Sequence, residues 1–230
     1  MEPQSRQPRL ARDTDQRIYD SIFAAVMQQR LKPGTRLPES ELGKLFGVSR
    51  TVVRKGLQRL AHDGIVSMRH NKGAAIASPS REETSEVFEA RRAIEAAIVP
   101  LVVQRADAAG LARLRAMLAT EHEMLHNKDA GWVQQAGAFH HTLAELSGNR
   151  VLQDFLRSLM SRCSLIVALY EAPGDAGCEH DEHAAIVEHI ARGEADAAVA
   201  LMTRHLDALE HRIQIRSEES EPDLGSLLGL

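Results

Sequence analysis

The chain has 230 residues, and its 43% hydrophobic, 26% charged and 3% aromatic residues fit two ordinary globular domains that are richer in helix than in sheet. No apolar run approaches the roughly 20 residues that span a bilayer, and the first dozen residues are polar, so we expect no secretory signal, no membrane partner and a cytoplasmic location. The two cysteines, Cys163 and Cys178, lie outside any CxxC pattern, and we expect both to be free thiols.

Charge is distributed unevenly along the chain. Residues 1–78 contain 14 Lys and Arg against 7 Asp and Glu, a net charge of +7. Residues 79–230 contain 14 against 25, a net charge of -11, and the two parts sum to -4. A basic part joined to an acidic part indicates that only the first part meets a polyanion such as DNA.

The N-terminal part begins with two predicted helices. Residues 1–13 are expected to form a flexible polar arm, and residues 14–31 a helix with apolar residues four positions apart. This helix stops where a proline and a glycine follow it. The short helix that comes next has three apolar residues that we expect to face inward: Leu42, Leu45 and Phe46.

A third helix and a small hairpin complete this part of the chain. The helix is expected over residues 51–63 with Ser49 as its N-cap, and two short strands are expected over 65–68 and 74–77. Helix, turn, helix and hairpin in this order predict a winged helix-turn-helix domain over residues 14–78. The last helix of such a domain lies in the major groove of DNA.

The residues expected to contact DNA lie at the start of the third helix and at the tip of the hairpin. Arg50 and Arg54 are one turn apart on the same face, and a guanidinium can bind guanine or phosphate through two hydrogen bonds. For any single arginine, an ordinary solvated helix face remains an equal alternative. The predicted DNA-binding set is Ser49, Arg50, Thr51, Arg54, Lys55, Lys72 and Gly73.

The remainder of the chain is expected to be helical. A linker is predicted at 79–82, an all-helical domain at 83–216 and a disordered tail at 217–230. Breaks at glycine, proline and asparagine residues divide it into helices over 81–106, 108–127, 130–146, 150–170, 180–192 and 194–216. The predicted fold class is therefore mainly α, a winged helix-turn-helix followed by an all-α bundle.

Three of the eleven histidines lie on apolar helix faces: His140, His183 and His205. If Gly193 lies at the turn of an antiparallel helix pair, a rise of about 1.5 Å per residue puts His183 and His205 at the same height, roughly 15 Å from that turn. Two imidazoles at the same height along the helix pair, both facing a third imidazole, fit a divalent ion such as Zn or Ni. Three hydrogen-bonded core histidines are an equal alternative.

The helix-turn-helix and hairpin read PGTRLPESELGKLFGVSRTVVRKGLQRLAHDGIVSMRHNKGAAIA, residues 33–77, with GVSRTVVRKGLQRLAHDGIV as the most specific segment. This stretch resembles the DNA-binding domain of the GntR family of bacterial transcription regulators. The resemblance implies that Ser49, Arg50 and Arg54 contact DNA and that Gly73 is the glycine of the wing tip. Ser40 stands near the position of a further DNA-contacting arginine in fatty-acid-responsive members.

The C-terminal part contains FEARRAIEAAI, FHHTLAELSGNRVL and EHAAIVEHIARGEADAAVALMTRHL. These segments resemble the FCD effector domain of the FadR branch of the same family, over about residues 81–215. The resemblance implies a metal held by one aspartate and three histidines, which match His140, His183 and His205. Ala136 stands at the position of the aspartate, so the implied site is weaker, is completed by water or an effector carboxylate, or holds no metal.

Arg91 matches the arginine of the family's R-x-x-(L/I)-E pattern, with Glu95 as the acidic residue. It either binds a carboxylate effector or forms a structural salt bridge with Glu95, and the sequence leaves both open.

These features predict a homodimeric repressor that binds operator DNA and is released when a small organic acid binds near Arg91, with the linker near Pro79 transmitting the change. Two alternatives are a three-histidine metal-dependent hydrolase and an architectural DNA-binding protein with an inert dimerisation domain. The sequence shows no obvious general base beside the histidines, which argues against the hydrolase.

Overall fold

The computed structural model describes residues 7–69, 73–127, 132–171, 176–213 and 215, and at a few positions next to the gaps only the backbone. The whole of the predicted tail at 217–230 lies outside the described residues, as does Lys72. None of the described helices is long and apolar enough to cross a membrane.

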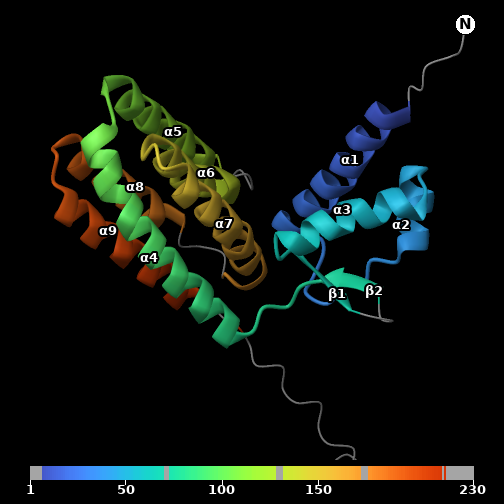
Figure 1. Ribbon diagram of the computed structural model, residues 1–230. Helices are drawn as coiled ribbons and strands as arrows, with labels where there is room; N and C mark the ends of the chain where they lie inside the picture. The colour runs from blue at the N-terminus through green and yellow to red at the C-terminus, as the bar shows by residue number, and fades with distance from the viewer. Residues whose placement is uncertain (1–6, 70–72, 128–131, 172–175, 214, 216–230) are drawn as a thin grey trace, which may run out of the picture.

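The N-terminal unit is a winged helix-turn-helix, as predicted (Figure 1). The two strands pair antiparallel, with Val66 opposite Ile76 and Arg69 opposite Gly73. The elements are α1 (Gln7–Met27), α2 (Glu39–Phe46), α3 (Arg50–His62), β1 (Val66–Arg69) and β2 (Gly73–Ile76).

Helix α3 packs closely against α1 because Gly56 has no side chain. A Cβ at this position would lie 3.0 Å from Cγ2 of Ile18 and 3.2 Å from the carbonyl oxygen of Asp15. Ile18, Leu57 and other apolar residues form the buried core beneath the two helices. The close packing fixes the direction in which the opposite face of α3 points.

Two predictions about the N-terminal unit are wrong in detail. Helix α1 begins at Gln7 instead of residue 14, because Pro8 lies in the first turn, where a proline removes no helical hydrogen bond. Leu45 is 79% exposed instead of inward-facing. The eight-residue α2 packs mainly against α3, so only the face that carries Leu42 and Phe46 is covered.

The C-terminal unit is an all-α bundle, also as predicted, and its helices agree with the predicted ranges to within four residues. Helices α8 and α9 form an antiparallel pair about Gly193, which adopts a left-handed conformation with φ of 77°. The helices are α4 (Arg81–Arg105), α5 (Ala108–His126), α6 (Trp132–Leu146), α7 (Arg150–Tyr170), α8 (Ala176–Ala191) and α9 (Ala195–Arg212).

Helix α7 belongs to both units. Its Leu165 is buried in the apolar core of the winged helix-turn-helix, and Leu169 packs against the same core. Arg162 lies over Gly64, where a Cβ would approach its Cγ to 2.8 Å. Figure 1 shows this end of α7 beside α1 and α3. The bundle is therefore connected to the N-terminal unit by side-chain packing as well as by the linker.

Candidate functional site

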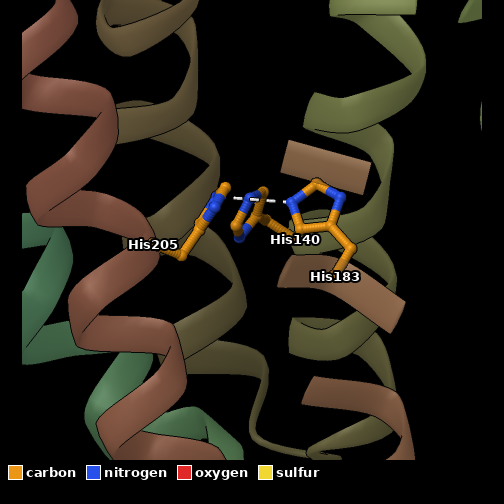
Figure 2. A group of neighbouring side chains, drawn as sticks. All are labelled: His140, His183 and His205. Carbon is orange, nitrogen blue, oxygen red and sulfur yellow. Dashed lines mark hydrogen bonds between the residues drawn. The ribbon is translucent and has the colours of Figure 1, made fainter. Parts of the chain in front are cut away.

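Three buried histidines converge inside the bundle. His140 comes from α6, His183 from α8 and His205 from α9, and none is more than 2% exposed. One ligand nitrogen of each lies within 4.8 Å of the others, and the Nε2 atoms of His183 and His205 are 3.3 Å apart. Figure 2 shows the three imidazoles turned toward one another. The prediction that these residues cluster is confirmed.

A glutamate faces the outer nitrogen of each imidazole. Nδ1 of His140 lies 2.5 Å from Glu95, Nδ1 of His183 lies 3.2 Å from both oxygens of Glu121, and Nδ1 of His205 lies 2.7 Å from Glu182. A carboxylate that accepts a hydrogen bond from Nδ1–H leaves Nε2 with its lone pair and holds the ring in place. This is the usual environment of a metal-binding histidine.

The charges around the histidines favour a divalent cation. The three glutamates carry a formal charge of -3, and the nearby Arg91 carries +1, which leaves -2 around neutral imidazoles. Glu95 and Glu121 are each 1% exposed, so water screens them little. A divalent ion among the Nε2 atoms would bring the formal charge to zero.

Burial keeps the imidazoles in the neutral form that binds metals. Burial, followed by the charge of Arg91, holds the pKa of His140 well below its usual value. Burial lowers the pKa of His205 to about 4, against the opposing effect of the hydrogen bond to Glu182. At neutral pH these two ligands therefore need not lose a proton before they bind a metal.

Arg91 forms the buried salt bridge that was one of its two predicted roles. Its Nε donates a 2.6 Å hydrogen bond to Glu95, and its Nη1 donates to Sγ of Cys163 at 3.0 Å. Both Arg91 and Glu95 are 1% exposed. The same guanidinium also faces a cavity beside the histidines, so the salt bridge leaves the second predicted role, effector binding, open.

This cavity has a volume of about 30 Å³, enough for about two water molecules. It lies beside His140 and His205, and Ala136 forms part of its wall. Since a methyl group offers no ligand atom, no side chain from this position completes a metal coordination shell. The cavity is lined by Arg91, Ala136, Gly137, His140, Met160, Cys163, Ser164, Val167, His205 and Leu209.

The donor set fits a divalent metal. One nitrogen of each imidazole converges, a carboxylate faces each ring at Nδ1, and a small cavity adjoins them on one side. Three imidazole nitrogens with one coordination position left open suit Zn and Ni.

The predicted DNA-binding residues on α3 all lie on its exposed face: Ser49, Arg50, Thr51, Arg54 and Lys55. Ser49 occupies the N-cap position, but its side chain makes no capping hydrogen bond. Gly73 is exposed at the start of β2 with φ of 79°, a conformation that favours glycine, and Lys72 lies outside the described residues.

The sequence analysis did not predict a role for Glu39, which lies next to the predicted DNA-binding set. Arg54 binds Glu39 of α2 through two hydrogen bonds, from Nε at 2.9 Å and from Nη2 at 3.0 Å. This pair holds the guanidinium of Arg54 in one orientation on the exposed surface. The order of the helices did not predict this ion pair, because Glu39 lies 15 positions from Arg54 in the sequence.

The sequence analysis found no obvious general base beside the histidines, and it missed that three glutamates face their Nδ1 atoms. A signal was present in α5, where Glu121 continues the buried stripe of Leu114 and Leu118 at helical spacing. Similarly, Glu95 lies on the buried face of α4 one turn after Arg91. A carboxylate on an apolar face indicates a buried partner.

Both structural units match families of known proteins. Residues 14–76 match the family described as bacterial regulatory proteins, gntR family, and residues 86–208 match the FCD domain. The regulator YdhC of Bacillus subtilis is 27% identical over 212 residues, which cover 89% of this chain and 93% of YdhC. The transcriptional repressor RspR of Escherichia coli is 22% identical over 210 residues, covering 90% and 92%.

A solved structure shares the same architecture. A GntR regulator from Rhodococcus sp. RHA1 superposes with a TM-score of 0.73 at 25% identity, covering 86% of this chain and 95% of that one.

A winged helix-turn-helix joined to a helical FCD domain defines the class of two-domain, DNA-binding transcription regulators. The chain belongs to the GntR family and carries the FCD domain of its FadR-type branch. It is therefore a transcription regulator and not an enzyme.

Proposed function

We propose that this protein is a homodimeric repressor that leaves its operator when a small organic acid binds in the helical bundle. The observation that carries the proposal is the cavity in which Arg91 and the histidine cluster meet. The name of RspR, a repressor, supports the sign of regulation. We expect the protein to act in the cytoplasm, where bacterial DNA lies.

The proposed DNA-binding domain spans residues 14–78 and is joined by a linker at 79–82 to the effector domain at 83–216. Arg50 and Arg54 project from the exposed start of α3, which suits contacts with bases or phosphates in the major groove. The complete proposed contact set is Ser49, Arg50, Thr51, Arg54, Lys55, Lys72 and Gly73.

The proposed metal ligands are His140, His183 and His205, and Zn or Ni is the proposed ion. When bound, the ion would supply a positive centre with an open coordination position for an oxygen ligand. Glu95, Glu121 and Glu182 fix the imidazole rings through Nδ1.

Arg91 is the proposed partner of the effector carboxylate. Its Nε already binds Glu95, so an incoming carboxylate would use the Nη atoms that now face Cys163 and the cavity. A cavity of about 30 Å³ is too small for an organic acid of five or more heavy atoms. Binding therefore requires that the cavity walls move.

Helix α7 provides a route from the cavity to the DNA-binding domain. Met160, Cys163 and Val167 line the cavity, whereas Leu165 and Leu169 of the same helix pack into the core of the other unit. A displacement of α7 by the effector would change how the two units pack. An inert dimerisation domain, the architectural alternative, would need neither the cavity nor this connection.

A gel mobility-shift assay on the intergenic DNA upstream of the gene tests the proposal, with a panel of short mono- and dicarboxylic acids as candidate effectors. We expect at least one acid to release the native protein but not the Arg91→Lys variant, which keeps the charge and loses the forked geometry. If every acid leaves the complex intact at millimolar concentration, or releases both proteins equally, the proposed effector site is wrong.

A further inference from the structure

A second pair of histidines lies outside the buried cluster, between α5 and α8. The ring centres of His122 and His180 are 5.1 Å apart, with the ring planes inclined at 46°. His122 is exposed and His180 is partly buried. Nδ1 of His180 is fully covered, and among the described residues it has no hydrogen-bond partner. A buried polar nitrogen without a partner is costly unless something binds it.

The spacing of this pair matches that of metal-binding imidazoles. Within the buried cluster the ring centres are 5.2, 5.3 and 4.6 Å apart. Two imidazoles that each bind one tetrahedral zinc ion through a Zn–N bond of about 2.0–2.1 Å have centres roughly 5 Å apart. His122 and His180 therefore stand at a distance that allows both to bind one divalent ion.

The pair lies next to the buried cluster in the fold. His122 directly follows Glu121, the carboxylate that faces His183. His180 lies one helical turn before His183 on the same face of α8, a rise of about 4.5 Å. An ion held by the pair would thus be about one helical turn from the histidine cluster.

The approach through the cavity is unfavourable for a cation. The cluster is almost completely closed to solvent, and Arg91 lines the cavity that adjoins it. A divalent ion on that path must pass a buried positive charge. On the side of α5 and α8 the carboxylate of Glu121 lies 3.2 Å from Nδ1 of His183, with no arginine in that contact.

We propose that His122 and His180 form a second divalent-cation site, of the zinc or nickel type, through which the buried histidine cluster is loaded. The loading role rests on the proposed metal site of the cluster, whereas binding by the pair does not. The pair offers two protein ligands and the cluster offers three, so the pair binds the ion more weakly. A site that passes its ion to another site must bind it more weakly than that site does.

Calorimetric titration of the metal-free protein with Zn²⁺ tests the binding. We expect one tight and one weaker site per chain, with the weaker one lost in His122→Ala and the tight one lost in His205→Ala. If His205→Ala does not fold, native protein loaded with one equivalent of Zn²⁺ is titrated with a second equivalent, which His122→Ala should fail to bind. A native protein without the weaker site would overturn the inference and leave the proposed function intact. A titration in which the native protein shows the weaker site but not the tight one would contradict the proposed metal site and, with it, the loading role.

Stopped-flow transfer of Zn²⁺ from a coloured indicator tests the loading role. The double variant His122→Ala/His180→Ala should take up zinc at least about tenfold more slowly than the native protein, because the local ion concentration is no longer raised. The final zinc content of its tight site should be unchanged. His126→Ala, an exposed histidine one turn further along α5, is the matched control and should load at the native rate. Equal rates for the double variant and the control would overturn the proposal.

Discussion

Arg91 and Glu95 form a fully buried ion pair one helical turn apart on α4, with 2.6 Å between Nε and Oε1. The second carboxylate oxygen of Glu95 lies 2.5 Å from Nδ1 of His140. Glu95 therefore connects the proposed effector-binding arginine to a proposed metal ligand. A displacement of Arg91 or of His140 therefore acts on the other residue through the side chain of Glu95.

Replacement of Glu95 by Gln should destabilise the protein strongly. Arg91 would then be left buried without its carboxylate, which costs about 3–5 kcal/mol in the free energy of unfolding. Urea denaturation measures this loss. Glu188→Gln is the matched control, because its 3.1 Å ion pair with Arg115 is about half exposed and should contribute less than about 1 kcal/mol. Similar small losses in both variants would show that the buried pair contributes little.

Replacement of Arg54 by Ala should weaken operator binding by about 1–3 kcal/mol, roughly 5- to 150-fold, as expected for loss of a base or phosphate contact. Glu39→Gln should have a smaller effect, because Arg54 keeps its charge but loses the partner that orients it. Fluorescence anisotropy on labelled duplex DNA measures both. Arg115→Ala, which removes an arginine from the bundle surface, should bind like the native protein. Full affinity in Arg54→Ala would refute α3 as the recognition helix.

Acid should destabilise the metal-free protein through His205. In the unfolded chain this imidazole takes up a proton near its usual pKa of 6.5, but in the folded protein only near 4, so protons favour unfolding over this range. Stability should be greatest above pH 6.5 and fall as the pH drops toward 4, with about 3 kcal/mol of the loss due to His205. Denaturation at pH 7.5 and 4.5 should show a smaller fall in His205→Gln than in native protein and in the exposed control His126→Gln. An equal fall in all three would contradict the assignment.

Removal of divalent metal should lower the melting temperature, because an ion that binds only the folded state stabilises it. We expect the purified protein to carry substoichiometric zinc or nickel, since only three protein ligands are available beside Ala136. Elemental analysis should find this metal absent from His183→Ala and retained in His189→Ala, whose imidazole pairs with Glu194 near the surface. Equal metal content in the two variants would exclude the histidine cluster as the site.

Much of the fold follows from local signals in the sequence. Gly193 predicted the turn between α8 and α9, and equal distances from that turn brought His183 and His205 together. The predicted break before residue 150 contains Asn149, whose side chain accepts hydrogen bonds from the backbone N–H groups of Val151 and Leu152. These features depend only on residues close in sequence or on one regular helix pair.

The features that escaped prediction depend on contacts between distant segments. Cys163 lies 72 positions from Arg91, and only the packing of α7 against α4 brings the thiol to the guanidinium. Leu45 has the spacing of a buried residue, but within the described parts of the chain no element covers that side of α2. Periodicity shows which residues share a face, but not whether another helix packs on it.

The central claim is that the basic face of α3 reads a specific DNA sequence. Fluorescence anisotropy with the full-length protein, a labelled upstream duplex and a shuffled duplex of the same composition, at several salt concentrations, tests it most directly. The account predicts that the upstream duplex binds at least about 10³-fold more tightly than the shuffled one, and that the logarithm of the affinity falls linearly with the logarithm of the salt concentration. Equal binding of the two duplexes, or none to either, would contradict the account.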